Sequence, residues 1–329
     1  MRESDWEGVR LHVVTGKGGT GKTTVAAALA LALAGEGRRT LLVEVENRQG
    51  IAQLFDTPPL PYEERSVAVG AGGGDVLALA VEAEEALLEY LEMFYKLGRA
   101  GRALRKIGAI DFATTIAPGM RDVLLTGKVY EAVRRKVGRS DVPVYDAVVL
   151  DAPPTGRITR FLGVNDEVSG LAKVGPIRSQ SDSIMRLLRS PKTVVHVVTL
   201  LEEMPVQETV DAVAELTKAG LPVGALIVNS VREPLLKVAD LTAAAKGALS
   251  HAEVAEGLAA AGVAIRENAL DALLVEAGEH AARVTLEKAG RKTLKGLGRP
   301  IYELPLLPEG IDLGGLYALA EALRGQGAA

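Results

Sequence analysis

The sequence contains no cysteine, and this absence excludes several kinds of chemistry. Disulfide bonds, thiolate metal sites and cysteine nucleophiles all require that side chain. Because disulfides are rare in the cytoplasm, we expect a cytoplasmic protein, peripheral to a membrane only through a partner. Aromatic residues are scarce, at 4% of the 329 residues, although 48% of the chain is hydrophobic. The core is therefore predicted to consist mainly of alanine, valine and leucine.

Long hydrophobic runs and an excess of positive charge are also lacking. The run Val25–Ala34 is much shorter than the roughly 20 residues of a membrane-spanning helix. Residues Met1–Asp5 are charged and lack the apolar segment of a secretion signal. A net charge of −4 argues against a nucleic-acid partner. The basic clusters Arg99–Lys106 and Arg134–Arg139 are interpreted as solvated helix faces.

Apolar, β-branched segments recur along the chain, with helical patterns between them. The segments predicted as strands are Leu11–Thr15, Thr40–Val45, Val76–Val81, Asp146–Asp151, Thr193–Leu200, Val223–Asn229 and Pro300–Leu304. Most are continuously apolar, which is typical of parallel strands covered on both faces. The predicted fold class is therefore α/β, with a mostly parallel, doubly wound sheet.

The predicted organisation is one domain over residues 1–329. Leu- and Ala-rich blocks at about 82–137 and 157–189 indicate an inserted helical subdomain, and a further helical segment covers about 234–297. Within that segment, Glu267–Leu297 is predicted to form an exposed hairpin arm or a helix across the sheet. Val69–Asp75, rich in glycine, is predicted to be a mobile loop. His12 and His196 lie inside apolar strands and are predicted to be packed rather than to bind a metal.

The segment between Thr15 and Val25 matches the phosphate-loop (P-loop) pattern. The residues predicted to bind the nucleotide there are Gly16, Gly18, Gly19, Thr20, Gly21, Lys22, Thr23 and Thr24. Glycines let backbone N–H groups converge on an anion, and the following helix presents its positive end to it. Lys22 supplies charge for the β- and γ-phosphates, and the Thr23 hydroxyl can ligate Mg²⁺. The motif predicts ATP and Mg²⁺ as cofactors; a Gly-rich turn without a ligand is the alternative.

A second lysine, Lys17, lies on the outer lip of this loop, where it could reach a phosphate bound to a neighbouring subunit. The pattern from Lys17 to Thr24 resembles the deviant P-loop of the family that contains MinD, ParA, nitrogenase iron protein and ArsA. Those proteins work as face-to-face dimers with two nucleotides at the interface. The resemblance implies a dimer in which Lys17 acts across the interface, and a solvated surface lysine is the alternative.

Another apolar segment ends in Asp151. A carboxylate at the carboxyl end of a parallel strand faces the ligand crevice, where it can hold Mg²⁺ through a water molecule. The turn Pro153–Gly156 is predicted to move with the γ-phosphate, unless it only caps the next helix. The string from Asp151 to Gly156 resembles the second switch of ArsA and of the ATPases that target tail-anchored membrane proteins. Ala117–Met120 resembles the Pro-Gly element of the same branch.

Two C-terminal segments resemble the adenine site of this branch. Asn229 ends an apolar strand, and its amide can both donate to and accept from the adenine edge; a turn-forming role is the alternative. Leu304–Gly310, with Pro305 and Leu306, resembles the loop that packs on the base. The resemblance covers about Leu11–Leu323 and is strongest to the ArsA-like, anion-transporting ATPases of actinobacteria.

The sequence departs from this family at the first switch. The family places there an aspartate that positions the attacking water, whereas this chain has Glu46 in the segment Val45–Gly50. Glu44, earlier in the strand, is a weaker candidate. A glutamate is one methylene longer, and a misplacement of about 1 Å can lower a rate roughly a hundredfold. A capping or salt-bridging role for Glu46 is the alternative. Without cysteine, neither the zinc clamp nor the thiolate arsenite site of these relatives can form.

The predicted function is therefore a dimer-forming Mg-ATPase whose turnover is slow. Its predicted catalytic residues are Lys17, Lys22, Glu46 and Asp151, with Thr23 and Asp151 at the metal. ATP would close two subunits and reshape a helical surface that meets a protein or membrane-protein client. The partner is either an identical chain or a paralogous ATPase, and no nucleic acid is expected. The alternatives are a weakly hydrolytic regulatory subunit paired with a paralogue, or a carrier for tail-anchored proteins. The helical insertions contain Met93, Met120 and Met185, which is little methionine for a groove that binds hydrophobic helices.

Overall fold

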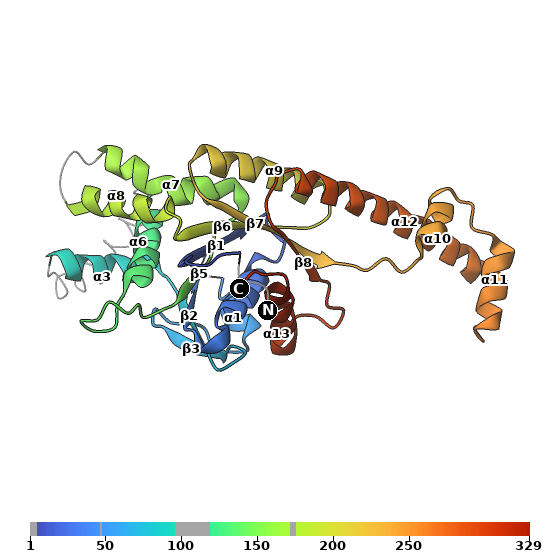
Figure 1. Cartoon of the computed structure of the whole chain (residues 1–329), viewed down its shortest axis with the longest axis horizontal. Coiled ribbons are helices and arrows are strands. Elements are labelled where there is room, and N and C mark those ends of the chain that lie inside the picture. Colours follow the sequence, from blue (N-terminus) through green and yellow to red (C-terminus); the bar gives the residue numbers. More distant parts are fainter. Residues whose placement is uncertain (1–4, 47, 96–118, 172–175) are drawn as a thin grey trace.

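The computed structural model describes residues 5–46, 48–95, 119–171 and 176–329 and contains one mixed sheet (Figure 1). Its strands are β1 (Leu11–Gly16), β2 (Thr40–Glu44), β3 (Arg65–Val69), β4 (Asp75–Ala80), β5 (Ala147–Asp151), β6 (Thr193–Thr199), β7 (Val223–Val231) and β8 (Ile301–Pro305). Across these described residues, the strand order is β3-β4-β2-β5-β1-β6-β7-β8, and only the β3–β4 pair is antiparallel. The predicted α/β class is confirmed, although the sequence reading missed the edge strand β3.

Helices cover both faces of the sheet. One face carries α1 (Lys22–Leu33), α2 (Gly50–Leu54) and α13 (Leu313–Gly325), and the other carries α6 (Met120–Arg134), α7 (Thr155–Leu171), α8 (Pro176–Leu188) and α9 (Glu203–Lys218), with α3 (Ala83–Tyr95) beside α6. Helix α1 has no polar face, because the sheet covers one side of it and α13 covers the other. Its alanines allow that close approach on two sides.

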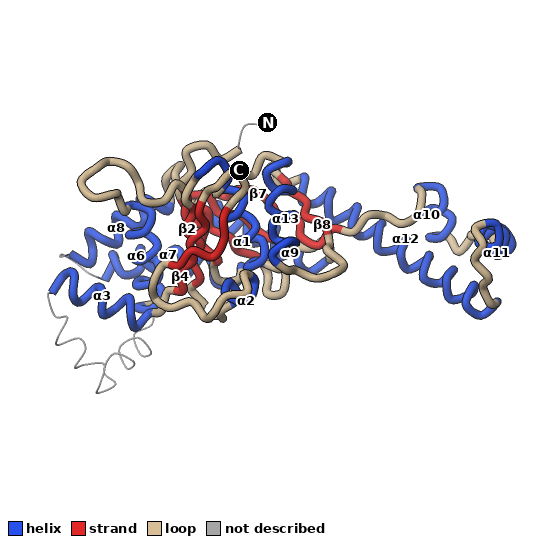
Figure 2. Tube along the Cα trace, turned by 90° about the horizontal axis from the view of Figure 1, so that it is seen from below, coloured by secondary structure: helices blue, strands red, loops and turns tan. Residues whose placement is uncertain are grey.

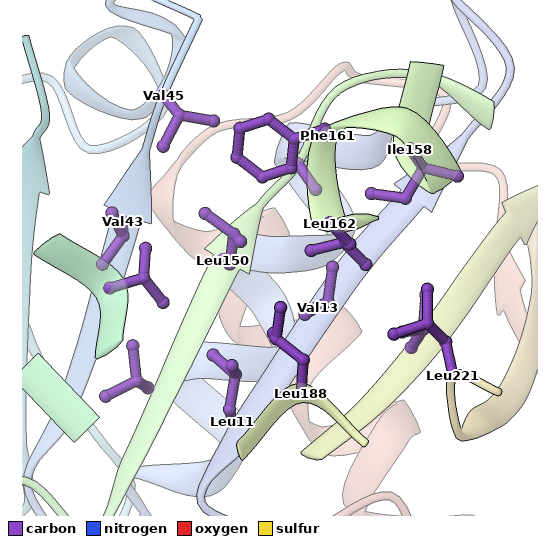
Figure 3. Packing of buried hydrophobic residues seen from close by; sticks show 14 of the residues in the cluster. Leu11, Val13, Val43, Val45, Leu150, Ile158, Phe161, Leu162, Leu188 and Leu221 are labelled. Carbon is purple, nitrogen blue, oxygen red and sulfur yellow. The ribbon is translucent and has the colours of Figure 1, made fainter. Parts of the chain in front are cut away.

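The second face of the sheet has a core of larger side chains (Figure 3). Val13 of β1 and Leu150 of β5 point toward α7, whose Ile158, Phe161 and Leu162 are almost completely buried against them. Burial of one such side chain contributes about 1.5–3 kcal/mol to folding. This packing fixes the position of α7, and α7 begins directly after the strand that ends in Asp151.

The two histidines within the sheet are packed, as predicted. His12 Nδ1 lies 3.2 Å from His196 Nε2 on the neighbouring strand, and both side chains are buried. The backbone N–H of Ala225 donates to His196 Nδ1 at 3.2 Å. Burial lowers the pKa of His12 to about 3 and places the pKa of His196 well below its usual value. Both imidazoles are therefore uncharged members of the core.

The glycine-rich segment Val69–Asp75, predicted to be a mobile loop, is a tight turn between β3 and β4. The N–H of Gly70 donates to the carbonyl of Gly74 at 2.6 Å. A Cβ on Gly74 would lie 1.8 Å from the carbonyl oxygen of Ala34, and one on Gly70 would lie 2.6 Å from it. The glycines are thus required because the turn packs directly on the end of α1.

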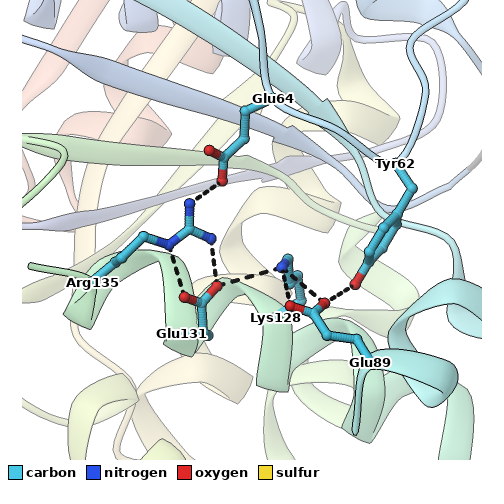
Figure 4. A network of polar contacts seen from close by, with 6 residues as sticks. All are labelled: Tyr62, Glu64, Glu89, Lys128, Glu131 and Arg135. Atoms are coloured by element: carbon cyan, nitrogen blue, oxygen red, sulfur yellow. Dashed lines mark hydrogen bonds and ion pairs between the residues drawn. The ribbon is translucent and has the colours of Figure 1, made fainter. Parts of the chain in front are cut away.

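A polar network joins the helices α3 and α6 to the connection that precedes β3 (Figure 4). Lys128 of α6 contacts Glu89 of α3 at 2.8 Å, and the Tyr62 hydroxyl donates to the same carboxylate at 2.6 Å. About two turns further on, directly after the end of α6, Arg135 forms ion pairs with Glu131 and Glu64. The side chain of Lys128 is only 11% exposed, so solvent screens this pair less than an exposed pair.

The segment between β7 and β8 forms an elongated arm. It consists of α10 (Val238–Ala245), α11 (His251–Ala260) and α12 (Glu267–Lys295). The C-terminal half of α12 packs on α9, whereas its N-terminal half carries α10 and α11 away from the sheet (Figure 2). The segment Glu267–Leu297 is predicted from the sequence to be either an exposed hairpin arm or a helix across the sheet, and the N-terminal half of α12 corresponds to the exposed arm. No helix in the described part of the chain is both long and apolar enough to cross a membrane.

Candidate nucleotide-binding site

The P-loop connects the end of β1 to the start of α1. Two of its glycines adopt positive φ angles, 88° at Gly19 and 84° at Gly21. A Cβ on Gly21 would lie 2.4 Å from the side-chain nitrogen of Asn229 and would displace this amide, and the positive φ angle is strained for any other residue. The Thr20 hydroxyl donates to the carbonyl oxygen of Lys17 at 2.9 Å and closes the loop on itself. The loop is therefore preorganised by its own backbone and by one strand end.

The N-terminus of α1 has the properties of an anion site. No side chain caps this helix end, and no acidic residue occupies its first turn. Its first N–H groups and the helix dipole therefore favour a negative ligand. Lys22, the first helical residue, is only 8% exposed and adds a positive charge at the same point. Thr23 and Thr24 follow it in the first turn.

The two residues predicted to bind the metal lie in direct contact. The Thr23 hydroxyl donates to Asp151 Oδ2 at 2.7 Å, which joins the start of α1 to the end of β5. Asp151 Oδ1 is buried and has no hydrogen-bond partner among the described residues. Mg²⁺ prefers oxygen ligands and needs few from the protein, since phosphates and waters complete its shell. A hydroxyl beside an unpaired carboxylate oxygen fits that ion.

The environment of Asp151 raises its pKa to about 6. Burial is the main cause, and the nearby Glu44 and Glu46 raise the pKa further. The Thr23 hydrogen bond and the charge of Lys22 oppose these effects. At neutral pH the carboxylate is mostly ionised, and it takes up a proton as the pH falls through 6.

Metal affinity is therefore expected to depend on this proton. The ionised fraction of a carboxyl with a pKa of about 6 falls about tenfold between pH 7 and pH 5, so Mg²⁺ affinity in the presence of ADP should fall similarly. Calorimetric titration of Mg²⁺ into the ADP-bound protein measures this change. The matched control is Asp151→Asn, because the asparagine side chain has nearly the same shape as aspartate but does not take up a proton in this pH range. Identical pH profiles for both proteins would show that Asp151 is not the titrating ligand.

The two glutamates of the first switch have different contacts. Strand β2 ends at Glu44, one residue before the predicted end, and Glu44 lies opposite Asp151 in the β2–β5 register. The Glu44 side chain is buried and accepts hydrogen bonds from the N–H groups of Arg48 at 2.8 Å and Ile51 at 3.3 Å. It therefore fastens the backbone at the start of α2.

Glu46, by contrast, forms ion pairs with arginines. Its carboxylate lies 3.5 Å from Arg48 and 3.7 Å from Arg157, and its side chain is 18% exposed. The salt-bridging alternative left open for Glu46 is thus present in the structure, while the capping role belongs to Glu44. Asn47, between the switch residues, lies outside the described residues.

Lys17 has a partner that sequence reasoning did not identify. Its Nζ lies 2.7 Å from Glu208 Oε1 on α9, and the two side chains are about one-third exposed. The Thr155 hydroxyl contacts the other oxygen of the same carboxylate at 3.5 Å. Glu208 therefore links the lip of the P-loop to the start of α7. Its distance from the loop along the chain leaves no local signal for this pairing.

The residues predicted to meet adenine also come together. Asn229 lies near the end of β7, and its side chain donates to the carbonyl oxygen of Thr20 at 3.0 Å. Pro305 ends the adjacent strand β8, and the N–H of Leu306 donates to the Val231 carbonyl at 2.8 Å. Leu306 is 40% exposed. The amide of Asn229 thus supports the P-loop, and Leu306 follows the end of the strand next to the one that carries Asn229.

The second switch connects the site to the helical face. The Thr15 hydroxyl donates to the Pro153 carbonyl at 2.7 Å, which ties the end of β1 to the turn after Asp151. Helix α7 then begins at Thr155. In the segment Ala117–Met120, the first two residues lie outside the described part of the chain, and Gly119 precedes α6 with a φ of 84°.

A strand–P-loop–helix unit at the carboxyl edge of a mostly parallel sheet, beside a buried aspartate, defines a P-loop NTPase fold. The sequence profile of the family described as anion-transporting ATPase, ArsA_ATPase, matches residues 9–191, and the chain belongs to this family, which implies nucleotide binding. It is 56% identical over 320 residues to ATPase BagA of Mycobacterium tuberculosis, covering 97% of this chain and 94% of that protein. It is 25% identical over 319 residues to the arsenical pump-driving ATPase of Acidiphilium multivorum, covering 92% of this chain and 52% of that protein.

Proposed function

We propose that this protein binds Mg-ATP at the P-loop and hydrolyses it slowly as part of a dimer. The proposal depends mainly on the contact between Thr23 and the buried Asp151. The second carboxylate oxygen of Asp151 has no hydrogen-bond partner among the described residues, and the buried Lys22 precedes Thr23 in the chain. A buried carboxylate without a full set of partners is costly in a folded protein. A metal ion bound between these residues and a polyphosphate would remove that cost.

Each residue has a definite role in this proposal. Lys22 and the first N–H groups of α1 hold the phosphates. Thr23 and Asp151 position Mg²⁺, which when bound neutralises charge that develops between the β- and γ-phosphates. Asn229 and Leu306 meet the adenine. Glu46 orients the attacking water, and Lys17 of one subunit acts on the nucleotide of the other.

Slow turnover follows from the contacts of Glu46. Its carboxylate is shared between Arg48 and Arg157, so it must leave one of these partners before it can hold a water molecule. The same observation favours a second candidate function, a nucleotide-binding regulatory subunit that pairs with a more active paralogue. Turnover of the isolated chain, measured with and without the paralogue, discriminates between the two.

Substitution of Glu46 tests the hydrolytic role directly. We expect Glu46→Gln to lower ATP turnover about 100-fold and to leave ATP affinity within about twofold, because the amide orients water poorly but keeps the shape. Glu46→Asp, which restores the family's residue, should retain turnover. Steady-state phosphate release and calorimetric ATP binding provide the two readouts. If Glu46→Gln turns over at the wild-type rate, Glu46 is only an ion-pair partner.

A client surface on the helical face is part of the same proposal. Helix α7 begins at the second switch, so a change at Thr155 would be transmitted along it. Of the methionines in the predicted helical insertions, Met185 is buried in the core and Met120 is 39% exposed, while the side chain of Met93 lies outside the described part. Methionine therefore contributes little to an apolar groove here. Capture of hydrophobic helices by the ATP-bound protein tests the carrier alternative.

A further inference from the structure

A small polar cavity lies next to the nucleotide-binding site, between the switches and the helical face. Its volume is about 110 Å³, and its charged lining residues are Glu46, Arg48, Arg121, Asp122 and Arg157. They come from the first switch, from the start of α6 and from the start of α7, and Pro153 of the second switch also lines the cavity. None of the arginines belongs to the residues assigned to ATP above.

The lining carries more positive than negative charge, with three guanidinium groups facing two carboxylates. The guanidinium contacts are long: Arg157 lies 3.7 Å from Glu46 and 4.0 Å from Asp122. Arg48 lies 3.5 Å from Glu46, and Arg121 donates to the Val45 carbonyl at 3.4 Å. Charge-assisted hydrogen bonds are usually about 2.7–2.9 Å long. The donors of these arginines are thus only loosely engaged.

The two carboxylates of the cavity do not fully occupy the arginine side chains around them. Burial raises the pKa of Asp122 above its usual value, and the nearby charges of Arg157, Arg121 and Arg160 oppose this shift. The side chains of Arg48 and Arg157 are 69% and 59% exposed, and they are free to turn toward a ligand. Phe161 and Leu125 close the apolar side of the cavity, where electrostatic attraction is less screened.

We propose that this cavity binds a tetrahedral oxyanion of the phosphate class. The planar fork of arginine matches phosphate oxygens with paired hydrogen bonds, and the small volume excludes a nucleotide base or sugar. The bound anion competes with Glu46 for Arg48 and Arg157, and in this way it frees the carboxylate that the proposed hydrolysis needs. Binding itself does not depend on that hydrolysis, so the two proposals fail separately.

The test is calorimetric titration of inorganic phosphate into the Lys22→Ala protein, in which the P-loop is disabled. We expect saturable binding, and the added changes Arg121→Gln and Arg157→Gln should weaken it at least about tenfold. Arg48→Gln, at an exposed position, should weaken it several-fold without risk to folding. The matched control is Arg186→Gln on α8, an exposed arginine outside the cavity, which should leave phosphate affinity within about twofold.

Two further titrations of inorganic phosphate distinguish the source of the anion; one uses wild-type protein saturated with Mg-ADP, and the other uses wild-type protein saturated with a nonhydrolysable ATP analogue. If free phosphate is the ligand of the cavity, its affinity should be the same in both. If the terminal phosphate of the nucleotide reaches the cavity, phosphate should fail to bind only in the presence of the ATP analogue. The proposal is overturned if phosphate fails to bind the Lys22→Ala protein, or if Arg186→Gln weakens binding as much as Arg121→Gln and Arg157→Gln do. Failure of ATP to bind the wild-type protein would overturn only the proposed function.

Discussion

Replacing Lys22 with alanine is expected to weaken ATP binding by at least about 100-fold. The lysine is 8% exposed at the N-terminus of α1, where little solvent screens its charge from a phosphate. Removal of one side of such a buried, charge-assisted contact typically costs about 3 kcal/mol or more, which is a factor above 100. Calorimetry with Mg-ATP, or displacement of a fluorescent analogue, measures the loss.

Stability should not suffer in this variant, because the substitution removes a buried charge rather than an apolar contact. It should also raise the pKa of Asp151 further, since Lys22 is one of the groups that lower it. The matched control is Lys218→Ala at the exposed end of α9, which should leave ATP affinity unchanged. If the Lys22→Ala protein is folded by thermal unfolding and binds ATP normally, the assignment of the P-loop is wrong.

Replacing Lys17 with alanine is expected to lower ATP turnover about 100-fold while ATP affinity changes little. In the proposed dimer this lysine supplies charge to the partner's nucleotide in the transition state, and a group with that role affects turnover more than binding. In the structure, Lys17 is held by Glu208 of its own chain at 2.7 Å. It must leave this carboxylate to reach across an interface.

Mixing two inactive proteins tests whether Lys17 acts across the interface. The Lys17→Ala chain can bind ATP, and the Lys22→Ala chain can lend its Lys17, so the mixture should regain part of the wild-type turnover. No recovery in a mixture that forms heterodimers would place the action of Lys17 within its own subunit. Glu208→Gln should raise wild-type turnover by a few-fold, as expected for an ion pair about one-third exposed and worth about 1 kcal/mol, and should have no effect in the Lys17→Ala background.

Much of the fold is readable from local pattern. The predicted parallel strands are present because a continuous run such as Thr193–Thr199 can be buried on both faces only in the middle of a layered sheet. The phosphate loop is equally local, since consecutive residues supply its turn, its charge and its helix N-terminus. The Thr23–Asp151 contact also follows once both segments are placed at the same edge of a parallel sheet.

Other features have no local signal. Strand β3 is mostly exposed or half-buried and lies at an edge, so its residues lack the apolar run of the central strands. The turn between β3 and β4 is glycine-rich because it packs on Ala34, and no neighbour in the sequence shows that contact. The sequence favours Glu46 over Glu44 at the first switch, but it does not show that Glu44 is buried on backbone N–H groups while Glu46 faces arginines.

By itself, the sequence determined the parallel strands of the sheet, the P-loop and the aspartate at the end of β5, because each depends on residues that are close together or on repeated apolar runs. Only the tertiary structure decided that Lys17 is held by Glu208, that Glu46 is shared between arginines, and that Arg121 joins them around a cavity. These contacts unite distant segments, and their geometry depends on how α6, α7 and α9 pack on the sheet.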